Sequence, residues 1–135
     1  MKRMSVATGT FDVKLNPLKQ EAPAEDAGLA RLSIDKQFHG DLTGKSVGEM
    51  MAVRTAIKES AGYVAIERVS GTLAGRSGHF VLQHTGIANR GALQLTVGVV
   101  PDSGTDGLTG LAGSMAIVVE GGKHSYTFTY TLPDA

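Results

Sequence analysis

The fold of this chain is decided by the stretch Leu111-Ala112-Gly113-Ser114-Met115-Ala116-Ile117-Val118-Val119-Glu120-Gly121-Gly122-Lys123-His124-Ser125-Tyr126-Thr127-Phe128-Thr129-Tyr130-Thr131-Leu132. Two runs in it alternate between apolar and polar residues, as half-buried strands do. Gly121-Gly122 predicts a two-residue hairpin turn between them, because glycine takes a positive φ at little cost. Such a turn places every large apolar side chain except Val118 on one face. The stretch therefore predicts an antiparallel hairpin of fixed register.

A second hairpin is predicted where Tyr63–Leu73 and Arg76–Thr85 flank Ala74-Gly75. A two-residue loop there pairs Val69 with Phe80, Glu67 with Leu82, Ala65 with His84 and Tyr63 with Gly86. Glu67 and His84 then become diagonal neighbours on one face, about 7 to 8 Å apart at the backbone. A three-residue bulged turn is the alternative, and it would separate the two side chains.

Further strands follow from the same alternation, and the loop 16–28 separates the first two of them. They are Met4–Leu15, Leu29–Phe38, Ala92–Val100 and Ser46–Ile57. For the last of these segments a helix is the alternative, which we do not favour. Eight strands in a short chain predict an all-β fold, a single domain over residues 1–135 that closes as an eight-stranded, mostly antiparallel barrel. A β-sandwich is the alternative, because the pattern hardly separates the two.

The composition narrows the class of protein. The chain has 135 residues, 18 of them glycine, which suits strongly coiled strands. Thirteen basic residues balance thirteen acidic ones, and this balance argues against nucleic-acid or anionic-lipid partners. Cysteine is absent, which excludes disulfides and thiolate chemistry. The sequence lacks a signal-peptide pattern and any apolar stretch of membrane-spanning length, so we expect a soluble cytoplasmic protein.

Three stretches, read together, resemble a known family. They are Phe38-His39-Gly40-Asp41-Leu42-Thr43-Gly44, the segment Tyr63–Gly86 with its Glu67-Arg68-Val69-Ser70-Gly71-Thr72-Leu73-Ala74-Gly75-Arg76, and Val99-Val100-Pro101-Asp102-Ser103-Gly104-Thr105-Asp106-Gly107-Leu108-Thr109-Gly110-Leu111. Their order and spacing resemble a bacterial family of unknown function whose members fold as small barrels similar to allene oxide cyclase. The resemblance implies an eight-stranded barrel and no activity, since fold likeness alone does not transfer chemistry.

Glu67 and His84 are the candidate catalytic residues. Both lie in rows of small or apolar residues, so a carboxylate facing the barrel interior would lose its hydration and need a partner. His84 can supply one, as can Arg76 or Tyr63. The pair is either an acid/base pair inside a pocket or a buried polar pair that only fixes strand register. The expected ligand-binding residues are Tyr63, Arg76, Phe80, Tyr126 and Phe128.

Other motifs carry less chemistry. Gly44-Lys45-Ser46 is similar to the end of a phosphate-binding loop, but His39 stands where that motif needs a glycine, so we interpret it as a turn between strands. The loop Pro101–Gly107 is rich in Asp, Ser and Thr, which favour turns, and its spacing is not that of a calcium loop. The histidines stand at no recognised metal-ligand spacing. We therefore expect neither a metal nor a cofactor.

Three functional hypotheses follow. The first is a barrel that binds a small, largely apolar molecule in its interior, with polar side chains orienting its polar end. The second is a cofactor-independent isomerase or cyclase that uses Glu67 as base and His84 as acid or orienting residue. The third is a structural module without a ligand that acts as a homo-oligomer. The sequence leaves open whether the chain is an enzyme.

Overall fold

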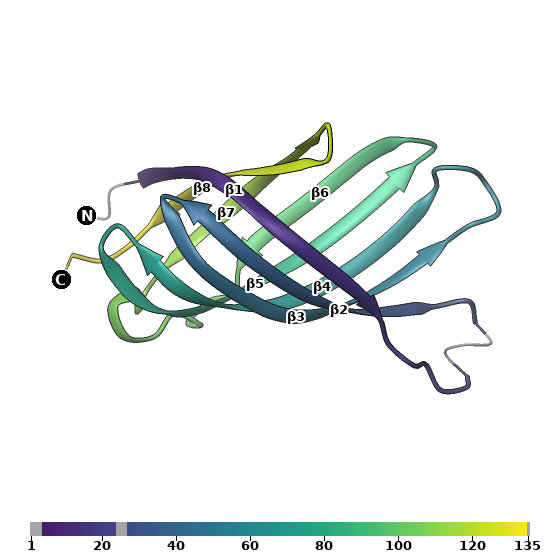
Figure 1. Ribbon diagram of the computed structural model, residues 1–135, viewed down its shortest axis with the longest axis horizontal. Coiled ribbons are helices and arrows are strands. Elements are labelled where there is room, and N and C mark those ends of the chain that lie inside the picture. The colour runs from purple at the N-terminus through teal and green to yellow at the C-terminus, as the bar shows by residue number, and fades with distance from the viewer. Residues whose placement is uncertain (1–3, 24–26, 135) are drawn as a thin grey trace.

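The computed structural model describes residues 4–23 and 27–134 and is a closed barrel of eight antiparallel strands (Figure 1). Each strand pairs with the next along the chain, and β1 with β8 closes the cylinder. This confirms the predicted eight-stranded barrel over the alternative sandwich. The strands are β1 (Met4–Pro17), β2 (Ala30–Gly40), β3 (Leu42–Arg54), β4 (Ala61–Leu73), β5 (Arg76–Asn89), β6 (Ala92–Val99), β7 (Ala112–Glu120) and β8 (Lys123–Thr131).

The two hairpins have the predicted registers. Met115 lies opposite Phe128 in the β7–β8 hairpin, and Ala65 lies opposite His84 in the β4–β5 hairpin. Both turns contain two residues of positive φ, as tight turns between twisted strands require. In the second turn one of them is Ala74, at φ 53°. The bulged alternative is therefore excluded, and the inward-facing rows are those that the alternation predicts.

The ambiguous segment is a strand, as predicted. It belongs to β3, which begins earlier than expected, at Leu42, and ends at Arg54. The interpretation of Gly44-Lys45-Ser46 as a turn is wrong, because these residues lie within β3 and pair with β2 and β4. The loop after β1 is present as expected, although its residues 24–26 lie outside the described part of the chain.

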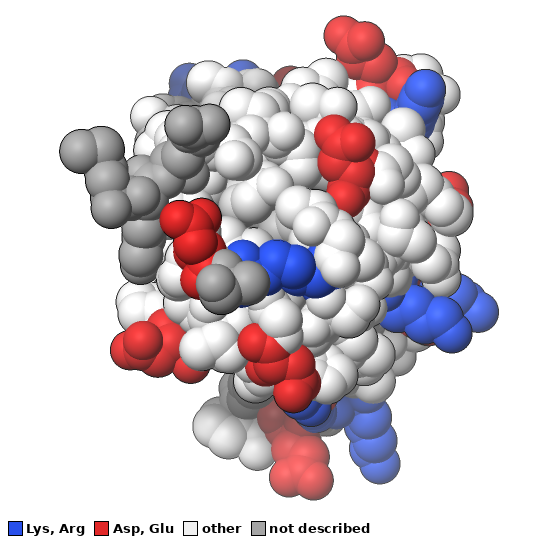
Figure 2. Space-filling model, turned by 90° about the vertical axis from the view of Figure 1, so that its left-hand side faces the viewer, with Lys and Arg blue, Asp and Glu red and all other residues white. Residues whose placement is uncertain are grey.

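One end of the barrel, at the left of Figure 1, is sealed by side chains of the core. The segment between β6 and β7 folds back over it, with a short 3-10 helix η1 (Asp106–Leu108). The hydroxyls of Ser103 and Thr105 accept hydrogen bonds from main-chain N–H groups of β5, at 3.0 and 3.1 Å. Leu108 and Leu111 are thereby buried in the core. Figure 2 views this end, where side chains cover the surface and acidic and basic groups are interspersed.

The opposite end carries the β1–β2, β3–β4, β5–β6 and β7–β8 connections and is open. On this side the wall is weakest between β6 and β7, which pair only at Gly98 and Ser114 in the described part of the chain. Within residues 4–23 and 27–134 we find no helix of the length and apolarity that crossing a membrane requires. The fold thus combines a packed core at one end with an accessible interior at the other.

Candidate functional site

Glu67 is the centre of the candidate site. It points inward from β4, between Ala65 and Val69, and its side chain is fully buried. Its partner on the neighbouring strand β3 is Gly48. A Cβ at Gly48 would overlap the backbone and side chain of Glu67. Glycine at that position therefore permits the close approach of β3 to β4 beside Glu67.

Both oxygens of the Glu67 carboxylate are hydrogen-bonded. Ser46 Oγ donates to Oε1 at 2.7 Å. Oε2 accepts from Lys36 Nζ at 2.8 Å and from His84 Nε2 at 2.5 Å. The cluster joins four side chains from β2, β3, β4 and β5. Every buried side-chain nitrogen and oxygen of the described residues has a partner, so the polar network is complete.

Sequence reasoning missed two members of the cluster, Ser46 and the charged Lys36. The Lys36 side chain is only 6% exposed. The ammonium lies over the ring of Phe11, 4.7 Å from the centroid, and 5.8 Å from that of Phe38. The sequence did contain a signal, because Lys36 stands between Ile34 and Phe38 on the apolar side of its strand. A lysine in such a row must find a counter-charge inside the barrel.

The protonation state of the cluster follows from its contacts. Burial by itself raises the pKa of Glu67, but the hydrogen bond from His84 and the charge of Lys36 outweigh it and lower that pKa to about 2. Glu67 is therefore a carboxylate at neutral pH. The nitrogen of His84 that lies against it, Nε2, carries a proton, since a carboxylate can only accept.

The second imidazole nitrogen of His84 is turned toward Tyr63. Tyr63 Oη lies 3.5 Å from Nδ1, and the two rings are 6.3 Å apart, inclined by 48°. Burial, together with the negative charge of Glu67, raises the pKa of Tyr63, so its hydroxyl stays protonated. The order Glu67–His84–Tyr63 thus leads from a fully buried anion to a half-buried phenol.

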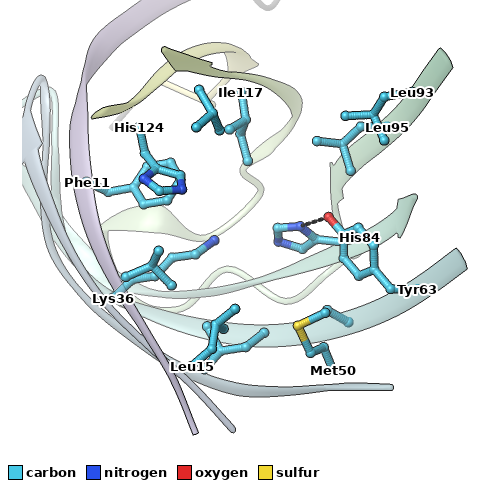
Figure 3. A pocket seen from close by; sticks show the side chains of 14 residues that line it. Phe11, Leu15, Lys36, Met50, Tyr63, His84, Leu93, Leu95, Ile117 and His124 are labelled. Carbon is cyan, nitrogen blue, oxygen red and sulfur yellow. Dashed lines mark hydrogen bonds between the residues drawn. The ribbon is translucent and has the colours of Figure 1, made fainter. Parts of the chain in front are cut away.

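Lys36, Tyr63 and His84 form the polar floor of a cavity at the open end. The cavity has a volume of about 250 Å³. Figure 3 shows the Lys36 ammonium and the His84 ring pointing toward one another at the floor, with Tyr63 beside the imidazole. Apart from these three and His124, the lining is apolar: Phe11, Val13, Leu15, Ile34, Met50, Ala65, Leu93, Leu95, Ile117 and Val119.

The structure separates the other expected binding residues from this cavity. Arg76 lies beside the β4–β5 turn at the sealed end, where its Nη1 donates to the carbonyl oxygen of Pro133. Phe80 and Phe128 are fully buried and stack on each other, with centroids 5.9 Å apart. The hydroxyl of Tyr126 accepts from the Leu42 N–H at 2.9 Å. None of these four predicted residues is among the described residues that line the cavity.

The remaining histidines have local partners. His39 Nε2 lies 3.0 Å from Asp12, and His79 Nδ1 lies 2.7 Å from the hydroxyl of Ser70. Both pairs are on exposed parts of the outer wall. The described residues contain no group of three or more His, Asp or Glu side chains arranged to hold a metal ion.

The cavity lining can contact a bound molecule through its apolar wall and through its polar floor. The apolar wall removes apolar surface from water, while Lys36 and Tyr63 offer donors and His84 offers a lone pair at the floor. Glu67 itself takes no part in contacts with a ligand, because it lies behind these side chains and has no exposed surface. Its role is to hold Lys36 and His84 in fixed orientations.

The comparisons agree with the fold. A family model described as "Protein of unknown function (DUF3224)" matches residues 7–130. The chain is similar to a crystal structure of a DUF3224 protein of unknown function from Shewanella oneidensis MR-1, with 49% identity and a TM-score of 0.90. That match covers 98% of this chain and 100% of the other. No curated protein matches the chain.

Proposed function

Because the chain belongs to the DUF3224 family, whose function is unknown, we propose a function from the site itself: the barrel binds a small, largely apolar molecule at its open end. The supporting observation is a cavity with apolar walls and a polar floor made by Lys36, Tyr63 and His84. Ligand pockets have this division, in which apolar surface supplies affinity and a few polar groups supply orientation.

The cavity volume sets the size of the ligand. Pockets for drug-sized molecules enclose about 300 to 1,000 Å³, so a cavity of about 250 Å³ suits a smaller one. An apolar cavity of about 150 Å³ holds benzene. By proportion, this cavity holds about ten non-hydrogen atoms. A longer molecule would extend past the rim formed by Leu93 and Val119.

The charges of the floor set the polarity of the ligand. The Lys36 ammonium is already neutralised by the Glu67 carboxylate, 2.8 Å away. A second carboxylate brought beside this pair would be repelled by Glu67 in a site of low dielectric. An uncharged acceptor such as a ketone or aldehyde oxygen avoids that repulsion and still accepts a hydrogen bond from Lys36. The proposed ligand class is therefore neutral, apolar carbonyl compounds.

Thermal shift assays and native mass spectrometry test the proposal. The panel contains small aromatic and terpenoid ketones, the matching hydrocarbons and the matching carboxylic acids. We expect the ketones to raise Tm most. Leu95→Trp, which fills the cavity, should abolish the shift, whereas Val64→Trp, on the exposed outer wall of β4, should preserve it. Absence of a shift with every ketone, or a shift unchanged by Leu95→Trp, overturns the proposal.

Three further expectations stay predictions. The first is the resemblance of the barrel to allene oxide cyclase, which is a proposal about fold and carries no activity to this chain. A homo-oligomer remains the alternative role, and exposed apolar side chains on the outer wall, among them Val47, Val64 and Ile66, support it. Light scattering over a range of concentrations tests this oligomer, and a strict monomer contradicts it.

The expected cytoplasmic location also stays a prediction. Localisation of the protein in cells tests it.

A further inference from the structure

The contacts of His84 give the cavity a basic nitrogen of fixed orientation. The ionised Glu67 accepts from Nε2 at 2.5 Å, so the neutral imidazole is held as the tautomer with a lone pair on Nδ1. Nδ1 faces Tyr63 at 3.5 Å, the long limit of a hydrogen bond, so little is lost when another group takes that place. A carboxylate that fixes an imidazole tautomer is the arrangement by which histidine acts as a general base.

Lys36 supplies the complementary group. Its Nζ and His84 Nε2 bond the same oxygen, Oε2 of Glu67, so the ammonium and the imidazole are neighbours at the cavity floor (Figure 3). A carbonyl oxygen that accepts from Lys36 therefore lies beside the His84 ring, and a carbon next to that carbonyl can reach Nδ1 at the edge of the ring that faces Tyr63 in the same cavity. Negative charge that develops at that oxygen is balanced, because His84 becomes an imidazolium in the same step and together with the Lys36 ammonium offsets Glu67 and the new charge.

We infer that the cavity catalyses proton transfer at carbon, with His84 as general base toward the carbon next to a carbonyl group held by Lys36. The inference rests on the proposed binding function. In the step, the C–H bond breaks and the proton passes to Nδ1. The electron pair of the broken C–H bond forms a C=C bond, and the π electron pair of the carbonyl group moves onto the oxygen that faces Lys36. The imidazolium then returns a proton to the same carbon or to a conjugated one, so the reaction is an exchange or an isomerisation and consumes no co-reactant.

The roles differ from those that the sequence suggested. Glu67 was the expected base, but both of its oxygens are occupied and it has no exposed surface. His84 lines the cavity and takes the role of base, while Glu67 is a positioning residue. Tyr63 keeps its proton, and its hydroxyl adjoins the same nitrogen, so it can hydrogen-bond the substrate once displaced from Nδ1.

Deuterium incorporation into phenylacetone, followed by proton NMR in deuterium oxide, tests the inference. This neutral aromatic ketone has about the size that the cavity holds. We expect the wild-type protein to exchange the α-protons at least about a hundredfold faster than His84→Gln, since a positioned general base contributes about 10² to 10⁴. Leu95→Trp leaves the polar cluster intact but fills the cavity, so it should reduce exchange to the background rate. Val64→Trp should exchange like wild type.

Two readouts separate the possible failures. Binding of phenylacetone is measured in parallel by thermal shift. If phenylacetone binds but exchanges no faster than with Leu95→Trp, proton transfer is overturned and the binding function stands. If it does not bind, both fail for this ligand class. Leu95→Trp keeps the test decisive even where His84→Gln does not fold.

The positioning role of Glu67 has its own readout. Because Glu67 does not reach the cavity and acts through Lys36 and His84, Glu67→Gln should lower kcat for exchange by about tenfold or more and change KM by a smaller factor than kcat. A rise in KM at unchanged kcat would contradict the assignment. Tyr63→Phe is the complementary variant, because it alters a side chain that does line the cavity, and it should change KM.

Discussion

Acid titration of the buried carboxylate provides a quantitative test of the cluster. The pKa of Glu67 is lowered from 4.5 to about 2 in the folded protein, where Lys36 and His84 stabilise the anion. Because the unfolded chain binds this proton first, the folded state loses stability as pH falls below about 4.5 and stops losing it once pH falls below about 2. At about 1.36 kcal/mol for each pH unit, the loss between about pH 6 and about pH 2 is about 3 kcal/mol.

Urea unfolding followed by circular dichroism measures this loss. In Glu67→Gln the group no longer titrates, so the acid-dependent fall in unfolding free energy should be smaller by about 3 kcal/mol. Glu49→Gln is the matched control, because Glu49 carries the same carboxylate on the exposed outer wall, paired with Arg31. Its acid profile should follow wild type, since exposed pairs contribute little. Equal slopes for wild type and Glu67→Gln across this pH range would refute the buried ion pair.

Three other substitutions test the surrounding structure by thermal and urea unfolding. Tyr126→Phe should cost about 1 to 3 kcal/mol, because a buried main-chain N–H loses its acceptor, and a cost near zero would contradict that contact. Gly86→Ala should destabilise and displace the ring of Tyr63, which a Cβ there would overlap, whereas Gly62→Ala should stay close to wild type, because a Cβ there meets only the Gly86 carbonyl oxygen at an ordinary contact distance of 3.8 Å; equal costs would refute the close approach. Ala74→Gly should stabilise by about 1 kcal/mol, because the turn holds this residue at φ 53°, and a loss of stability would count against that turn.

The registers of both hairpins were predictable because local signals determine them. A two-residue turn sets which residues oppose each other, and alternation sets which side of each strand is apolar. For the β4–β5 hairpin these two signals suffice to bring Glu67 and His84 to one face and near each other. No long-range information enters that prediction, which is why it holds at the level of single residue pairs.

The other partners of Glu67 depend on long-range geometry. Lys36 is 31 residues away in sequence and Ser46 is 21. Their contacts with Glu67 depend on how β2 and β3 are staggered in the closed barrel, and strand alternation carries no information about stagger. Ser46 was also hidden within a motif that pattern alone assigned to a turn. Inward-facing polar residues were visible in the sequence, but the pairing between them was not.

The sequence pattern also did not predict where along the barrel axis each inward-facing side chain lies. Phe80 and Phe128 face inward as predicted, yet they lie in the packed core rather than in the cavity. What decides this is the segment between β6 and β7, which folds over one end and buries Leu108 there. Alternation with a period of two predicts which side chains face the barrel interior and which face solvent. It does not predict which end of the interior remains open.

The position of the polar cluster argues for function rather than for register alone. Replacing a buried ion pair by packed apolar residues is often neutral or stabilising, so stability does not by itself explain Lys36 and Glu67. Nor is the cluster needed to set the register of β4 and β5, because the turn at Ala74-Gly75 and the alternation of both strands already do so. The cluster lies at the boundary where the packed core ends and the cavity begins. Lys36, Tyr63 and His84 face the open end from that level, which is the position that the proposed binding and proton transfer require.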